Sequence, residues 1–299
     1  MQKTVRDIIR ENSRPLQPLP TGQRTRLAQL AGIRAVLFDI YGTLFISGSG
    51  DIGANQINNQ TDQLRRIVQE TFRTTGLPTP PQDVDILELK KQAVLASHHE
   101  SRAAGIEYPE VDIIDIWRTV LRGLSSDGAW SCPALTDEIL MRLAVEYEVR
   151  TNPVWPMPAA NACLTELRAA GLILGVVSNA QFYTPELFPA LLKRDLGDYG
   201  IGADRQWFSY RHGRAKPGTE LYLSAREHLA SRDIAAEEVL FVGNDMLNDI
   251  AAAHDVGFRT ALFAGDQRSL RLREGEARVN DIVPDLVIDQ LDQLPSCVL

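Results

Sequence analysis

The sequence has little positive charge. Its 39 acidic side chains outnumber its 31 lysines and arginines, the formal net charge is -8, and no extended run of basic residues occurs. Nucleic acids and anionic membrane surfaces are bound by clustered basic side chains. We therefore expect neither nucleic acid nor a membrane as a partner.

Cysteines and long apolar runs are also scarce. The three cysteines, Cys132, Cys163 and Cys297, are odd in number, far apart and without metal-ligand spacing. This usage is typical of a chain kept in a reducing compartment rather than of a disulfide framework. No apolar run approaches the ~20 residues of a membrane helix, and the first residues, MQKTVRDIIRENSRP, are too charged for a secretory signal. We expect a cytoplasmic protein.

Hydrophobic periodicity divides the chain into a helical part and an alternating part. With 299 residues, 44% of them hydrophobic, the chain can form a full core. Apolar residues recur at helical spacing within 64–72, 113–124 and 139–147, which predicts a helical insertion over 47–154. A proline-rich segment, 152–158, marks its end.

The remainder predicts an α/β domain. Strand-like runs at 172–178, 239–243, 259–263 and 286–288 are separated by helical patterns. Such alternation predicts a parallel sheet with helices on both faces. Residues 1–30 contain short apolar segments and a proline-rich link, so we expect an extension that packs on this domain.

One local pattern points to chemistry. An apolar run from Ala35 to Phe38 ends in Asp39 and a Gly-Thr turn. Such a run suits a strand covered on both faces, and ligands of open α/β sheets bind at the carboxyl ends of the strands. Asp39 is therefore predicted to face a cleft, where its carboxylate is a candidate nucleophile.

Three more segments extend this pattern in chain order. They are Leu174-Gly-Val-Val-Ser178-Asn179, Arg214-Ala-Lys216-Pro217, and Val239-Leu-Phe-Val-Gly-Asn244-Asp245-Met-Leu-Asn248-Asp249. Together with the segment around Asp39, they resemble the motif set of the haloacid dehalogenase (HAD) superfamily. The matches cover most of residues 34 to 263.

The resemblance implies an architecture and a reaction. It implies a Rossmann-like α/β core made of residues 31–46 and 155–299, with residues 47–154 inserted as a helical cap of the first type. Members of the family attack phosphorus or carbon with the aspartate and form a covalent intermediate. The resemblance makes Asp39 the nucleophile.

It also implies roles for other residues. Lys216 would neutralise the nucleophile and the substrate, and Thr43, Ser178 and Asn179 would bind the substrate. From the residues alone, Ser178 and Asn179 are also compatible with capping a turn, and Lys216 with a solvated loop.

A metal site is the next expectation. The +3 and +4 spacing places Asp245, Asn248 and Asp249 around the first turn of a helix. Mg²⁺ takes hard oxygen ligands, often one or two carboxylates, so we expect Mg²⁺ to be held by Asp39, the Tyr41 carbonyl, Asp245 and Asp249. Many family members place the metal-binding aspartate directly after the glycine, where this chain has Asn244. The alternative is that Asn244 or Asp245 only caps the helix.

Tyr41 departs from the phosphatase pattern. Phosphatases of the family usually have a second aspartate there as the acid and base, and a phenol, with a pKa of ~10 against ~3.9 for Asp, does not simply replace it. Haloacid dehalogenases share Asp-x-Tyr-Gly-Thr and need no Mg²⁺. However, clustered carboxylates repel one another unless a cation lies between them, which favours a metal enzyme.

Three functional hypotheses follow. The first is a Mg²⁺-dependent phosphohydrolase that acts on a small phosphorylated metabolite through an aspartyl-phosphate on Asp39, with Tyr41 and Lys216 as the other catalytic positions. The alternatives are a metal-independent 2-haloacid dehalogenase with an Asp39 ester, and a catalytically slow binding protein. The substrate and the oligomeric state are left open.

Overall fold

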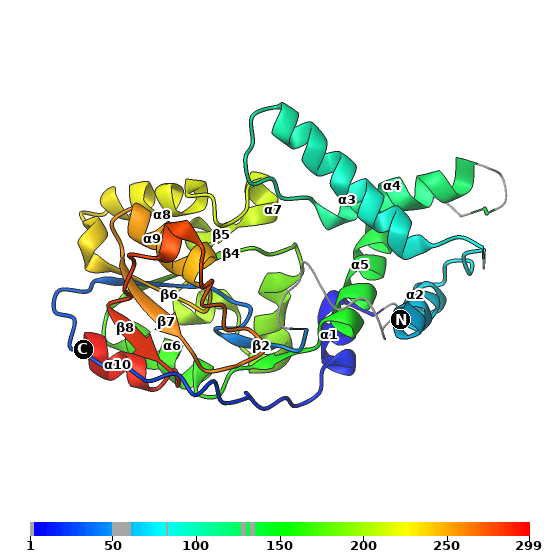
Figure 1. Ribbon diagram of the computed structural model, residues 1–299. Coiled ribbons are helices and arrows are strands. Elements are labelled where there is room, and N and C mark those ends of the chain that lie inside the picture. The colour runs from blue at the N-terminus through cyan, green and yellow to red at the C-terminus, as the bar shows by residue number, and fades with distance from the viewer. Residues whose placement is uncertain (1–2, 50–60, 82, 127–129, 132–134) are drawn as a thin grey trace.

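The computed structural model describes residues 3–49, 61–81, 83–126, 130–131 and 135–299 (Figure 1). Its core is a six-stranded sheet with the order β5-β4-β1-β6-β7-β8, in which every neighbouring pair is parallel. The strands are β1 (Ala35–Phe38), β4 (Ile173–Ser178), β5 (Gln206–Phe208), β6 (Val239–Gly243), β7 (Arg259–Phe263) and β8 (Leu286–Ile288).

The register of the central strands determines where their ends meet. Phe38 at the end of β1 pairs with Val176 of β4 and Val242 of β6. Residues that follow these three strands therefore emerge at one edge of the sheet, as expected for an open parallel sheet. The α/β, Rossmann-like fold class predicted from the sequence is confirmed.

Helices cover both faces of the sheet. Alternate residues of β1 enter different cores, Val36 and Phe38 on one face and Ala35 and Leu37 on the other. The first core contains α1 (Val5–Asn12), α6 (Ala160–Ala169) and α10 (Gln293–Val298), and the second contains α8 (Glu220–Ala230) and α9 (Ala252–Asp255). Burial of one such apolar side chain stabilises the fold by about 1.5–3 kcal/mol.

Four longer helices form a region with its own core. They are α2 (Thr61–Thr75), α3 (Ile86–Ala103), α4 (Ile113–Ser126) and α5 (Asp137–Thr151). Phe72, Trp117 and Leu140 are buried in a cluster separate from those of the sheet. Figure 1 shows α3 and α4 projecting away from the sheet. The three predicted helical runs are confirmed, whereas α3 was not predicted as a helix; the domain boundaries stay a prediction.

Short elements connect these parts. β2 (Phe45–Ser47) pairs antiparallel with β3 (Val154–Pro156) where the chain leaves and re-enters the sheet domain. The N-terminal extension lies along the sheet edge, because Arg26 and Val287 exchange backbone hydrogen bonds of 2.8 and 3.0 Å. A short helix, α7 (Ser209–His212), follows β5. None of the helices in the described ranges is both long and apolar enough to span a bilayer.

Candidate active site

Three side chains predicted from separate segments meet at the carboxyl edge of the sheet. Asp39 directly follows β1, and its Oδ1 accepts a 2.7 Å hydrogen bond from Lys216 Nζ. The same ammonium lies 2.6 Å from Asp249 Oδ1. All three side chains are nearly excluded from solvent, with exposed fractions of 7%, 4% and 2% in the order Asp39, Lys216, Asp249. One buried cation thus joins two buried carboxylates.

Asn179 fixes the backbone of Lys216. The Lys216 N-H donates to Asn179 Oδ1 at 2.8 Å, and Asn179 Nδ2 donates to the Lys216 carbonyl at 3.2 Å. The segments after β4 and before α8 are therefore held together by a reciprocal pair of hydrogen bonds. Asn179, predicted as a substrate-binding residue, has a side chain that holds the backbone of Lys216.

Asp249 and Asp245 have different surroundings, although both were predicted as metal ligands. Asp249 Oδ2 accepts the backbone N-H groups of Asn244 and Asp245 at 2.9 and 3.0 Å. Asp245 Oδ1 accepts the N-H groups of Leu247 and Asn248, which caps the one-turn π-helical stretch Met246–Ala251. The guanidinium of Arg273 also binds both oxygens of Asp245.

That Asp245 is a metal ligand stays a prediction. Its carboxylate is used by the helix cap and by Arg273, the capping alternative that the sequence left open. Asn244, the residue before it, faces the nucleophile's turn instead: Thr43 Oγ1 donates to Asn244 Oδ1 at 3.1 Å. Side chains at successive positions leave a strand in opposite directions, so a shift of one residue exchanges their roles.

The turn after Asp39 leaves no room for a side chain at Gly42. Gly42 has φ +82°, and a Cβ atom there would lie 2.5 Å from Ser269 Cβ and 2.8 Å from Asn244 Nδ2. The turn is closed by bonds from Leu44 N and Phe45 N to the Ile40 carbonyl at 3.0 and 2.9 Å. Glycine is required here, because both the positive φ and the close neighbours exclude a Cβ.

The Tyr41 hydroxyl contacts a neighbouring threonine. Its hydroxyl is 2.9 Å from Thr184 Oγ1. Burial raises the pKa of Tyr41 above its ordinary value, and the negative charges of Glu148 and Asp39 raise it further. A phenol with a raised pKa remains neutral at pH 7 and is a poor general base.

Several donors beside Asp39 have no strong acceptor. In the described ranges of the chain, the backbone N-H groups of Ile40, Tyr41 and Asn179 donate no hydrogen bond. The buried Ser178 hydroxyl makes only a 3.5 Å contact, to the Asn179 carbonyl. Unpaired N-H groups that follow neighbouring strands are the usual components of an anion-binding concavity. The site is therefore suited to an anionic group.

The side chains of the predicted Mg²⁺ site make contacts within the protein. Across the described residues, no group of three or more His, Cys, Asp or Glu side chains is arranged to hold a metal ion. Asp245 is bound to Arg273, and the remaining pair, Asp39 and Asp249, has Lys216 between its members. The cation that the clustered carboxylates were expected to require is thus supplied by the protein itself.

Burial and neighbouring charges shift the pKa values of Asp249 and Lys216. Burial raises the pKa of Asp249 to about 7; Lys216 acts in the opposite direction, while Asp39 and Asp245 raise the value further. The two carboxylates raise the pKa of Lys216, which outweighs the lowering effect of its burial. Lys216 is therefore charged at neutral pH.

A comparison with models of protein families leads to the same family as the ordered motifs. The model of the haloacid dehalogenase-like hydrolases matches residues 33–257. The chain belongs to this family of hydrolases. Its enzymatic class, predicted from the sequence, is confirmed.

The proteins similar to this hydrolase include one named as a phosphatase and one named as a dehalogenase. A ribulose-1,5-bisphosphate 5-phosphatase of Halopiger xanaduensis is 30% identical over 143 residues, which is 48% of this chain and 56% of the relative. The chain thus matches little more than half of that relative. A crystal structure of a 2-haloacid dehalogenase from Pseudomonas syringae pv. Tomato DC3000 superposes with a TM-score of 0.52, 23% identity, and coverage of 89% of this chain and 97% of that one. The latter shows the shared fold.

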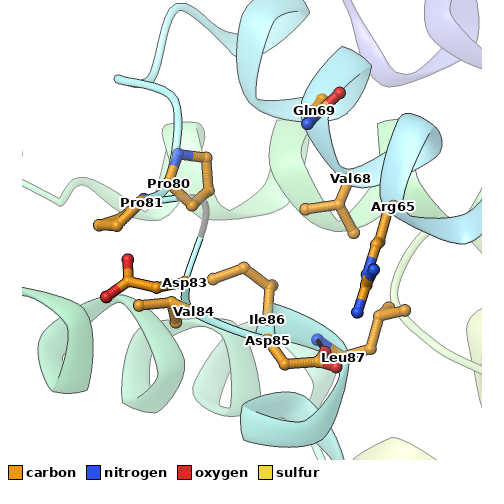
Figure 2. Close-up of a pocket in the computed structure, with 10 residues that line it drawn as sticks. All are labelled: Arg65, Val68, Gln69, Pro80, Pro81, Asp83, Val84, Asp85, Ile86 and Leu87. Atoms are coloured by element: carbon orange, nitrogen blue, oxygen red, sulfur yellow. Dashed lines mark hydrogen bonds between the residues drawn. The ribbon is translucent and has the colours of Figure 1, made fainter. Parts of the chain in front are cut away.

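Two hollows on the hydrolase lie away from the buried trio. One, of about 120 Å³, lies between α2 and the start of α3 and is lined by residues such as Arg65, Val68 and Ile86 (Figure 2). The other, of about 490 Å³, lies between the N-terminal extension and the segments after β7 and β8. Neither includes Asp39 or Lys216, so the assignment of the site rests on the side chains around Asp39.

Sequence reasoning missed two partners of the site. The Tyr222 hydroxyl donates to the Asn248 carbonyl at 2.8 Å and so holds the turn that presents Asp249. Arg273 neutralises Asp245 from a loop 28 residues away. Tyr222 lies on an ordinary apolar helix face and Arg273 in an irregular loop, so neither had a local signal.

Proposed function

We propose that this hydrolase forms an ester between Asp39 and a small 2-halo carboxylic acid and then hydrolyses it without a metal ion. The observation that carries the proposal is the position of Lys216, whose ammonium lies 2.7 Å from Asp39 and 2.6 Å from Asp249. It occupies the place between the carboxylates where a metal ion was expected. The nucleophile is thereby held and neutralised by the chain alone.

The nature of the leaving group supports this choice. With Tyr41 half-buried, in contact with Thr184 and neutral, no acid stands two residues after the nucleophile. An alkoxide departs slowly without a proton, and general acid catalysis typically contributes ~10²- to 10⁴-fold. A halide ion departs without protonation. The site therefore favours displacement of halide over cleavage of an alkyl phosphate.

The charge balance acts in the same direction. Lys216 provides one positive charge against Asp39 and against Asp249, whose raised pKa of about 7 leaves it only partly ionised at neutral pH. A monocarboxylate substrate adds one negative charge, whereas a phosphate monoester adds up to two. Two like charges 4 Å apart repel by about 4 kcal/mol at an effective dielectric constant near 20. The unpaired N-H groups of Ile40, Tyr41 and Asn179 suit the two oxygens of one carboxylate.

The reaction balances without a co-reactant. A carboxylate oxygen of Asp39 attacks the carbon that bears the halogen, a C-O bond forms, and the C-halogen bond breaks with its electron pair leaving on the halide. Water then attacks the ester carbonyl of Asp39, which releases the 2-hydroxy acid, a proton and the free aspartate. Lys216 balances the charge of Asp39 before the attack and after the release.

A second candidate is the phosphohydrolase predicted from the sequence. The observation that favours it is the 30% identity to a relative named as a ribulose-1,5-bisphosphate 5-phosphatase. In this alternative Asp39 forms an aspartyl-phosphate on a small phosphorylated metabolite. The predicted Mg²⁺ has less support than the aspartate, because Asp245 is bound to Arg273.

Substrate and metal dependence separate the two candidates. We expect the purified hydrolase to release chloride from 2-chloropropionate at a rate that EDTA does not change, because Lys216 performs the neutralisation. We expect little release of nitrophenol from p-nitrophenyl phosphate. Chloride measurement with an ion-selective electrode and absorbance of nitrophenol, each with EDTA and with added Mg²⁺, are the assays.

Two other outcomes of these assays would support a different function. Strictly Mg²⁺-dependent hydrolysis of p-nitrophenyl phosphate without chloride release would replace the proposal with the phosphohydrolase. No turnover of either compound, with or without Mg²⁺, would instead favour the slow binding protein as the physiological role.

A further inference from the structure

The connection between α3 and α4 lies on the sheet domain directly beside the catalytic lysine's loop. We call residues 108–112 the strap. Ala215 N donates to the Tyr108 carbonyl at 2.8 Å, and Glu110 N donates to the Gly213 carbonyl at 3.2 Å. Pro109 and Arg214 form an antiparallel bridge. The strap therefore pairs with the residues that immediately precede Lys216, and Figure 1 shows this connection passing α7.

The strap also binds the segment after β4. Gln181 Nε2 donates to the Val111 carbonyl at 2.9 Å, and Ile113 N donates to Gln181 Oε1 at 3.0 Å. Gln181 is two residues from Asn179, whose side chain holds the Lys216 backbone. The strap thus contacts both segments that Asn179 and Lys216 join.

Glu110 supplies the side-chain link between these segments. Its Oε2 accepts a 2.7 Å hydrogen bond from Ser209 Oγ, and Ser209 Oγ in turn accepts Ala180 N at 2.9 Å. Its Oε1 accepts Val111 N at 2.9 Å. Ser209 is fully buried and Ala180 nearly so. Within the described residues, no basic side chain forms an ion pair with Glu110. Its carboxylate instead holds the buried Ser209 hydroxyl.

Even partial burial of such a carboxylate is costly. Desolvation raises the pKa of Glu110, and the hydrogen bonds from Ser209 and Val111 only partly oppose this. A buried acceptor that lost its donors would cost about 1–3 kcal/mol. An uncharged side chain would fill the space without this cost, so packing alone gives no reason for a carboxylate.

We propose that Glu110 is a positioning residue for the chemistry at Asp39. Through Ser209 it orients the segment that carries Asn179, and Asn179 holds the backbone of Lys216. The four-helix region is in this way coupled to the nucleophile by a chain of hydrogen bonds from the strap. This inference rests on the proposed hydrolysis at Asp39, but the loop geometry it describes is testable without turnover.

The test uses four single variants of the 299-residue chain and one double variant. Glu110→Ala removes the acceptor, Glu110→Gln keeps an acceptor oxygen, and Ser209→Ala removes the bridging hydroxyl. Glu107→Gln is the matched control, because Glu107 is an exposed carboxylate of the same connection. Turnover of 2-chloropropionate, or of p-nitrophenyl phosphate if only that is cleaved, and amide hydrogen exchange of peptides covering 178–184 and 213–218 are the readouts.

The expected pattern is specific. Glu110→Ala and Ser209→Ala each lower kcat by about 10- to 100-fold with little change in KM, because small displacements of catalytic groups have effects of this size. A double variant that combines them is no worse than either single one, since both remove the same link. Both single variants accelerate exchange in the two peptides, Glu110→Gln restores most of kcat, and Glu107→Gln matches the wild type.

Other results overturn the inference. Lower thermal stability of Glu110→Ala with unchanged kcat at a temperature where it is folded would show a purely structural carboxylate. Additive losses in the double variant would show that Glu110 does not act through Ser209. If no substrate is turned over, faster exchange in both peptides still supports the loop coupling while the proposed function fails, and unchanged exchange refutes the coupling.

Discussion

Asp39→Asn is expected to lower turnover of 2-chloropropionate by roughly 10⁴- to 10⁶-fold, the range seen when a covalent nucleophile is removed. The amide keeps the shape of the side chain but is not a nucleophile. The fold should remain intact, because the substitution removes one of two carboxylates that share the single cation Lys216. Steady-state kinetics, with circular dichroism to confirm folding, measure the effect.

The matched control is Asp245→Asn. This is the same chemical change at a neighbouring buried carboxylate that binds Arg273 and its own helix rather than Lys216. We expect it to lower stability while retaining most turnover. A loss as large as that of Asp39→Asn would restore the role of metal ligand predicted from the sequence. Near wild-type activity of Asp39→Asn, in protein shown by mass spectrometry to contain no aspartate regenerated by deamidation, would exclude the covalent mechanism.

Lys216→Met is expected to abolish turnover and to destabilise the protein by about 3–5 kcal/mol, the usual effect of removing one partner from a buried ion pair. The lysine side chain is 4% exposed, and its loss leaves Asp39 and Asp249 without a cation between them. Methionine fills a similar volume, so the change mainly removes charge and hydrogen bonds. Urea unfolding monitored by circular dichroism gives the free energy of unfolding.

The double variant Lys216→Met/Asp249→Asn separates electrostatics from packing. Removing the second carboxylate relieves the repulsion, so much of the lost stability should return while turnover remains absent. If Lys216→Met is as stable as the wild type, the ammonium does not neutralise the two carboxylates. If the double variant is no more stable than Lys216→Met, the loss comes from packing instead.

The sequence predicted that Asp39 and Ser178 lie at one edge of the sheet, because each ends or follows a strand that was evident from its apolar pattern. Lys216 was expected beside them from the family resemblance alone. Parallel strands bring such ends to one edge of a sheet. The strands β5, β2 and β3 escaped prediction, because each has only three residues and too few apolar positions to show a period. Helix α3 escaped because its apolar residues do not gather on one face.

Which side chains surround Asp39 was harder to predict from the sequence. Spacing placed Asp245, Asn248 and Asp249 around one helical turn, but it did not show which of Asn244 and Asp245 leaves β6 toward the nucleophile. That choice depends on Arg273, which approaches Asp245 from a distant loop. The cation expected between the carboxylates was Mg²⁺, and the structure places the Lys216 ammonium between Asp39 and Asp249. Long-range contacts of this kind leave no trace in a local pattern.

A single-turnover reaction in H₂¹⁸O tests the central claim, ester formation on Asp39, most directly. With the hydrolase in excess over 2-chloropropionate, the account predicts that the product receives its new oxygen from Asp39 and is unlabelled. Mass spectrometry of the peptide that contains Asp39 should then show ¹⁸O, because water attacks the ester carbonyl. Label in the product and none in Asp39 after the first turnover would contradict the account, since water would have attacked the substrate without an Asp39 ester.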